Sequence, residues 1–93
     1  MTRIGTLDGE GGLIIDGQNV GACRYRIEIS RSRSLVEGKG GVEADPRALE
    51  RFFQARAAIL ELETGGSIGL LPLSWDRMTR IATVRVTGAI PGF

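Results

Sequence analysis

Arginines alternate with apolar residues in RYRIEISRSR, residues 24–33, and the stretch ends in two arginines separated by serines. Guanidinium groups bind phosphate and carboxylate oxygens in a planar, bidentate geometry, so a row of arginines is typical of surfaces that bind acidic partners. Residues 24–33 hold four arginines and one glutamate, a local net charge of +3, and residues 77–85 hold three arginines and no acid. The alternative is that these arginines form the solvated face of a β-strand.

The two arginine-bearing segments make one binding surface only if they lie side by side. Neighbouring strands would place Arg24, Arg26 and Arg85 on one outward face, where they could follow a phosphate backbone. Binding of single-stranded nucleic acid also needs aromatic side chains on which bases stack, and Trp75 in the loop LSWDR is the only one that could be free. Trp75 could instead pack over a barrel rim beside Pro72. The candidate binding residues are Arg24, Arg26, Arg31, Arg33, Arg85 and Trp75.

The usual enzyme designs lack their key residues. The sequence contains no histidine, the side chain that most often serves as general base and as metal ligand. Lys39 lies in GKGG, which has no apolar neighbours to lower the pKa of a lysine and lacks the spacing of a phosphate-binding P-loop. We therefore expect no nucleophile of the Ser-His, Cys-His or Ser-Lys kind.

The carboxylates do not form a recognisable site either. Asp8, Glu10 and Asp16 do not follow the spacing of a calcium-binding EF-hand loop. Glu61 and Glu63 would project from one strand face with α-carbons about 7 Å apart, as alternating glutamates do on any half-buried strand. The sequence predicts no catalytic residue, no cofactor and no metal.

Arg47 and Arg51 form an RxxxR pair on a predicted helix. The pair resembles the first half of the phosphate-binding motif of PilZ-type receptors for cyclic dinucleotides. That family's second half, Asp/Asn-x-Ser-x-x-Gly, is not matched, because GGSIG (65–69) has glycine in place of the acid and a different spacing from serine to glycine. Arginines four residues apart on a helix are also ordinary solvent-facing residues, so the resemblance does not extend to a predicted site.

Length and composition indicate one ordinary globular domain. The chain has 93 residues, 42% of them hydrophobic, and a net charge of +1, so no global field attracts nucleic acid or a membrane. Cys23 is the only cysteine, which excludes an internal disulfide and fits a reducing compartment. No apolar segment approaches the ~20 residues of a membrane span. We expect a soluble, cytoplasmic protein.

Short apolar runs between glycines predict an all-β fold. GLII (12–15), the turn DGQN and a run from Val20 indicate a hairpin. In the second strand, alternation places Cys23, Tyr25, Ile27 and Ile29 inward. The next region is expected to be one interrupted strand or two short ones, because a mobile GKGG separates SLVE from VEA. Residues 1–10 are expected to be a flexible segment before a single domain at 11–93.

A helix is predicted to begin at Asp45, which can cap it, with Pro46 in the first turn and Leu49, Phe52 and Phe53 on one face. Residues 57–63 could continue this helix or form a strand. We favour a strand and a hairpin, because LELETGGSIG (60–69) alternates and has the same order of strand, turn and strand as LIIDGQNVG (13–21).

The last strand, RIATVRVTG (80–88), should turn Ala82, Val84 and Val86 inward, and Phe93 in the tail could cover an open end of the core. The predicted fold is mainly β: a small antiparallel barrel, OB-like or related, of about six strands with one short helix between the third and fourth. The predicted function is that of a non-enzymatic binding or assembly module that binds a protein partner or self-associates through an edge strand. Nucleic-acid binding through the arginine faces is the alternative.

Overall fold

The computed structural model describes residues 1–93 as a closed antiparallel barrel of six strands, with one short helix between the third and fourth. The elements are β1 (Thr2–Ile15), β2 (Gln18–Ser32), β3 (Leu35–Glu43), α1 (Pro46–Phe53), β4 (Ala58–Glu61), β5 (Ser67–Asp76) and β6 (Ile81–Thr87). The predicted fold is therefore confirmed. Six strands in a closed barrel also distinguish this architecture from the OB fold, which has five strands and is partly open.

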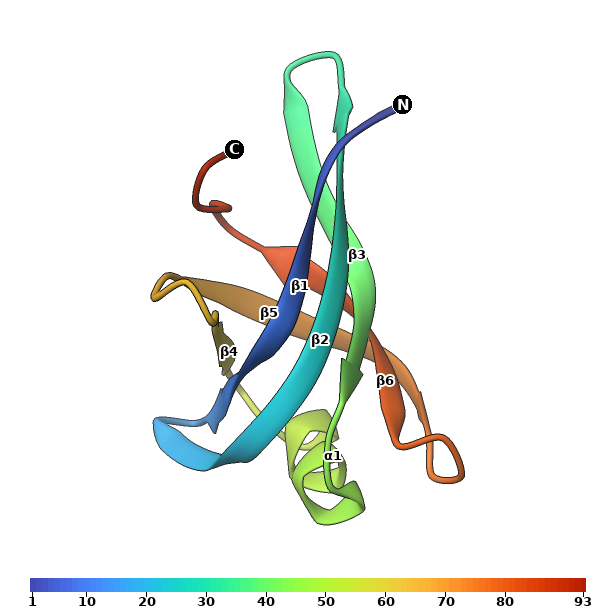
Figure 1. Ribbon diagram of the computed structural model, residues 1–93. Helices are drawn as coiled ribbons and strands as arrows, with labels where there is room; N and C mark the ends of the chain where they lie inside the picture. The colour runs from blue at the N-terminus through green and yellow to red at the C-terminus, as the bar shows by residue number, and fades with distance from the viewer.

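The barrel consists of two three-stranded meanders joined by α1. The strand order is β1-β2-β3-β6-β5-β4, so the first strands of the meanders pair with each other and so do the third strands. Figure 1 shows α1 at one end of the barrel, and the β2–β3 turn projecting from the opposite end, where both chain termini also lie. The helix therefore closes one end of the core.

The β1–β2 hairpin turns at Asp16 and Gly17, as the sequence predicted. Their φ angles of 49° and 84° are those of the tight two-residue turn that suits the twist of antiparallel strands. The carboxylate of Asp16 also accepts the backbone N–H groups of Arg56 and Ala57, each at 3.0 Å. The hairpin is thereby attached to the segment that leads into β4.

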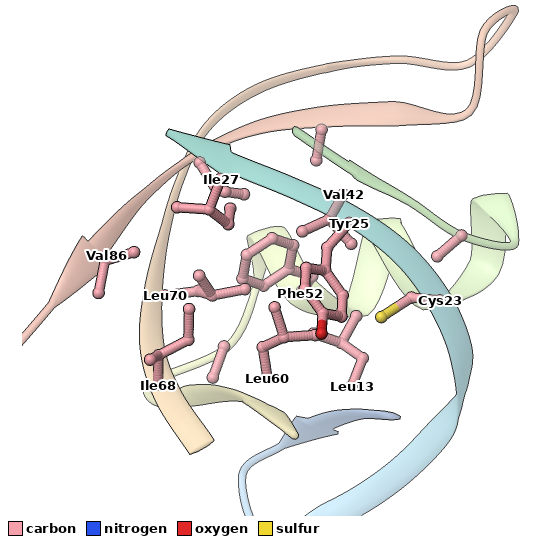
Figure 2. Packing of buried hydrophobic residues seen from close by; sticks show 14 of the residues in the cluster. Leu13, Cys23, Tyr25, Ile27, Val42, Phe52, Leu60, Ile68, Leu70 and Val86 are labelled. Carbon is pink, nitrogen blue, oxygen red and sulfur yellow. The ribbon is translucent and has the colours of Figure 1, made fainter. Parts of the chain in front are cut away.

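The core forms from the inward side chains of the strands and from α1. Cys23, Tyr25, Ile27 and Ile29 are all buried, which confirms the predicted face of β2, and Phe52 of the helix is fully buried. Figure 2 shows the ring of Phe52 among side chains of five strands, including Leu13, Tyr25, Val42, Leu60 and Leu70. No buried side chain of the core is charged.

β1 begins earlier than the sequence suggested. The first ten residues were assigned to a segment before the barrel, but β1 pairs with β2 from Thr2 opposite Arg31 to Ile15 opposite Gln18. The glycines of this segment weakened the strand signal. Two of them stand where neighbouring groups approach closely: a Cβ on Gly11 would overlap the carbonyl oxygen of Glu61, and the ring of Phe93 lies against Gly5.

β3 is one uninterrupted strand, and its GKGG segment is not a mobile loop. Residues 35–43 pair with β2 throughout. Clustered glycines are a turn signal in sequence, but here they allow close strand contact, because a Cβ on Gly40 would overlap the carbonyl oxygen of Arg26.

The helix and the following hairpin agree with the favoured prediction. Asp45 caps α1 by accepting the N–H of Arg47 at 2.8 Å, and Pro46 is the first helical residue. Leu60 lies in β4, opposite Ile68 of β5, so the helix does not continue into residues 57–63. In β6, Ala82, Val84 and Val86 are buried as predicted.

Candidate functional site

Charged side chains cover the outer surface of four neighbouring strands, β1, β2, β3 and β6. We call this surface the charged face; its residues are Asp8, Glu10, Arg24, Arg26, Glu28, Lys39, Glu43 and Arg85. The strand register aligns them in rows, such as Glu10–Arg24–Glu43 and Glu28–Lys39–Arg85. Acids and bases alternate in the first of these rows, whereas two bases are adjacent in the second.

Arg24 and Arg26 each have an acidic partner on β1. Nη2 of Arg24 lies 3.2 Å from Oε1 of Glu10, and Nη1 of Arg26 lies 3.5 Å from Oδ2 of Asp8. These side chains are more than half exposed, so each pair contributes at most about 1 kcal/mol to stability. The pairs do, however, reduce the positive potential that two unpaired arginines would present.

Arg85 does not join Arg24 and Arg26. The condition for a continuous arginine stripe was that β2 and β6 are neighbours, but β3 lies between them. Arg85 instead stands directly opposite Lys39, whereas Arg24 stands opposite Glu43. Sequence alternation could identify the outward residues but not which strands would be adjacent.

Arg31 and Arg33 lie at the end of the projecting β2–β3 hairpin (Figure 1). Arg31 is opposite Val36, and Arg33 occupies the turn with a φ of 59°. Both are exposed, and neither takes part in an ion pair. They are therefore separate from the arginines in the middle of the charged face.

Trp75 lies in β5, opposite Ala82, and not in a loop. Its ring is half-buried, with its centroid 6.4 Å from that of Phe53. The guanidinium of Arg77 lies 5.2 Å from the centroid of the Trp75 ring. These contacts are those of a residue that packs on the barrel rim, which was the alternative interpretation of Trp75.

A groove of about 600 Å³ opens on the charged face between β2, β3 and β6. Lys39, Arg85, Ser30 and Thr83 line it, and so do the acidic residues Glu28 and Glu37. The sequence analysis assessed Lys39 only as a catalytic lysine and missed this arrangement. The alternation of β3 and β6 contained the signal, since both residues face outward, but their alignment depends on the register.

Cys23 is placed for packing and not for catalysis. The residue is 5% exposed, and burial raises the pKa of its thiol from the ordinary 9.0 to about 11, against a smaller opposing effect of a backbone hydrogen bond at Gly11. A neutral thiol is a poor nucleophile and a poor metal ligand at neutral pH.

The carboxylate of Glu63 also has a structural position. Its Oε1 accepts a hydrogen bond from the backbone N–H of Glu10 at 3.4 Å. The backbone N–H of Glu63 donates to the hydroxyl of Tyr25 at 3.0 Å. Glu63 thus fills the space between β1 and the β4–β5 turn.

Of the RxxxR pair, Arg51 donates to the side-chain oxygen of Gln18 at 2.8 Å.

One edge of β1 has no strand beside it. β4 pairs with β1 only from Gly12 to Ile15, so residues 2–10, which we call the free edge, are paired with β2 alone. The N–H of Glu10 faces away from β2, because it donates to Glu63. Alternate residues of an antiparallel strand face the same side, so the N–H and C=O groups of Asp8 and Thr6 also face away from β2.

Three large apolar side chains are exposed on β4 and β5. They are Ile59, Leu71 and Leu73, which are 41%, 45% and 41% exposed. Ile59 stands directly opposite Ile14 of β1. The sequence analysis did not single them out, although they occupy outward positions of alternating strands.

The chain matches no known protein family, no curated protein and no solved structure. The one helix, α1, lacks the length and apolar character needed to cross a bilayer. No three His, Cys, Asp or Glu side chains come together in a way that could hold a metal ion. The free edge and the charged face are therefore the features from which a function can be argued.

Proposed function

We propose that the protein is a cytoplasmic, non-enzymatic assembly module that pairs with a second copy of itself along the free edge of β1. The observation that carries this proposal is the row of backbone groups at residues 2–10 that face away from β2 without a partner strand. An unpaired strand edge of this length is a template for another strand. The single thiol, buried and unpaired, fits the reducing environment of the cytoplasm.

The free edge is covered at its ends and open in the middle. The side chain of Glu63 bonds to Glu10, the ring of Phe93 lies against Gly5, and the register shifts between Arg3 and Gly5. Such bulges and coverings limit uncontrolled pairing. The Glu63 side chain also lies close to Gly9. The stretch from Thr6 to Asp8 has none of these coverings, so a short partner strand would add there.

Charge along β1 favours a second copy in antiparallel orientation. Arg3 lies near the start of the strand, and Asp8 and Glu10 lie further along on its outer side. Antiparallel pairing of two copies brings the basic end of each β1 to the acidic end of the other, and opposite charges across strands stabilise the pair. The exposed Ile59 and the half-buried Ile14 lie on the adjoining part of the barrel and add apolar surface to the contact.

Sedimentation at two protein concentrations tests this function. We expect the sedimentation coefficient to rise with concentration for the native chain and to stay at the monomer value for Thr6→Lys, because a lysine on a strand edge opposes pairing. Thr6 is opposite Glu28, so the new lysine has an acidic neighbour in its own chain. The matched control is Thr83→Lys, an outward threonine on β6, which is paired on both sides.

Dimerisation of the control together with a monomeric Thr6→Lys would support the proposal. A native chain that stays monomeric at both concentrations would refute it, as would equal dissociation by Thr83→Lys. Nucleic-acid binding is less favoured, because Arg24 and Arg26 have acidic partners. Salt-sensitive binding of mixed-sequence RNA that Arg24→Ala with Arg85→Ala weakens would restore that alternative.

A further inference from the structure

Two cations face each other on the charged face without an acid between them. Lys39 of β3 and Arg85 of β6 are directly opposite in the register. Side chains in such positions have Cβ atoms about 4.5–5.5 Å apart, and like charges there destabilise the sheet. Neither residue takes part in any of the three ion pairs of the protein, so no ion pair within the chain offsets this repulsion.

The surroundings of the two cations supply further hydrogen-bond donors. Lys39 and Arg85 line the groove of about 600 Å³, and so do Ser30 and Thr83. Thr83 is two residues before Arg85 on β6 and thus faces the same side. An ammonium, a guanidinium and a hydroxyl together match the acceptor oxygens of a phosphate or carboxylate group.

Acidic residues limit the size of the anion that fits. Glu28 is opposite Lys39 but is bonded to Arg3 at 3.4 Å, and Glu37 lies two residues before Lys39 on the same face of β3. Glu43 lies on that face beyond Gly41. Glu28 and Glu37 line the same groove as the two cations. A chain of phosphates along the strand would meet all of these carboxylates, whereas a single oxyanion between Lys39 and Arg85 lies one strand away from Glu28.

We propose that Lys39 and Arg85 bind a small molecule through one compact oxyanionic group, a phosphate monoester or a carboxylate, with Thr83 as an additional donor. The anion neutralises the facing charges that the fold otherwise leaves opposed. The site lies on the outer wall of β3 and β6 and does not depend on self-association through β1.

Titration with inorganic phosphate at constant ionic strength, followed by amide chemical shifts, tests the site. We expect saturable shifts centred on Lys39, Thr83 and Arg85, and a dissociation constant about ten- to a hundredfold weaker in Arg85→Gln and in Lys39→Gln. The matched control is Arg26→Gln, which removes an exposed arginine that already has an acidic partner. Binding by the control should equal that of the native chain.

Thermal unfolding gives a second readout. Phosphate should raise the melting temperature of the native chain and of Arg26→Gln but not of Arg85→Gln, because only a ligand bound to the folded state stabilises it. Without phosphate, Arg85→Gln should melt no lower than the native chain, since it removes a repulsion. Shifts that never saturate, equal loss in Arg26→Gln, or tighter binding of oligothymidylate than of phosphate would overturn the proposal.

Discussion

The Cys23 thiol illustrates how a single side chain responds to the barrel core. Burial raises the pKa of the thiol from 9.0 to about 11. Between these pH values the thiol of the folded protein therefore keeps its proton, whereas the thiol of the unfolded chain has lost it. Between those two values the folded state binds more protons, and stability therefore falls as the pH rises from about 9 to about 11. Below about pH 9 the contribution is constant.

The same burial predicts slow chemical modification of Cys23. At pH 8 an aromatic disulfide reagent should label the native protein much more slowly than the protein in denaturant, because the reactive thiolate is scarce and the sulfur is covered. The labelling rate in the two conditions provides the measurement. A native rate close to the unfolded rate would mean that the thiol is accessible and would contradict the placement of Cys23 in the core.

Residue-level inference from sequence worked where alternation alone decides the outcome. The inward faces of β2 and β6 were predicted because side chains on a strand alternate. The partners of Arg24 and Arg26 were not predicted, since Glu10 and Asp8 lie in a segment that had been assigned outside the barrel. An ion pair between two strands depends on their register, and the sequence of one strand does not specify how it aligns with its neighbour.

At the scale of elements, the adjacent glycines Gly11 and Gly12 of β1 differ in the space available for a side chain. A Cβ on Gly11 would overlap the carbonyl oxygen of Glu61, whereas the nearest atom to a Cβ on Gly12 is 3.5 Å away. Gly11→Ala should therefore lower the free energy of unfolding by about 1–3 kcal/mol, through displacement of β4. Chemical denaturation measures the loss.

Gly12→Ala is the matched control for that change. Alanine reduces the freedom of the unfolded chain and meets no close atom, so the variant should be neutral or slightly more stable. Equal destabilisation by both variants would show that β1 and β4 do not approach each other as closely at Gly11 as the structure indicates.

Glycine explains why the element boundaries were harder to predict than the elements themselves. The helix, its cap at Asp45 and the hairpin at Asp16 and Gly17 follow from local signals. The start of β1 and the continuity of β3 do not, because glycine marks turns in most sequences. In this barrel several glycines instead stand where strands approach closely.

At the scale of the whole molecule, the carboxyl-terminal tail completes the barrel at the end opposite α1. A turn at Gly92, with a φ of 82°, and the bond from the N–H of Phe93 to the oxygen of Ile90 at 3.1 Å direct the ring of Phe93 against Gly5. The tail therefore covers β1 at Gly5. The ring of Phe93 remains 41% exposed and is not part of the core, whereas the sequence had suggested that it covers an open end of the core.

Phe93→Ala should lower the free energy of unfolding by about 1–2 kcal/mol, the contribution of a partly buried aromatic ring. The matched control is Met78→Ala, because Met78 is 91% exposed and its loss should have little effect. Thermal or chemical denaturation of the two variants distinguishes them. A Phe93→Ala protein as stable as the control would mean that the tail does not pack on β1.

The overall topology was predictable only in part. Element order and the short loops indicated a barrel with a helix between its halves, but not that β3 would separate β2 from β6. Adjacency across the barrel depends on how the two meanders meet, and that is a property of the whole core and not of a local pattern. The groove at Lys39 and Arg85 was unforeseen for this reason.

The two meanders meet in an equivalent way on both sides of the barrel. First strand pairs with first strand, β1 with β4, and third with third, β3 with β6, so the two halves have the same strand order. LIIDGQNVG and LELETGGSIG then occupy equivalent hairpins. Each meander therefore offers its first and third strands as edges to the other, and residues 44–57 are the one chain connection between the two halves.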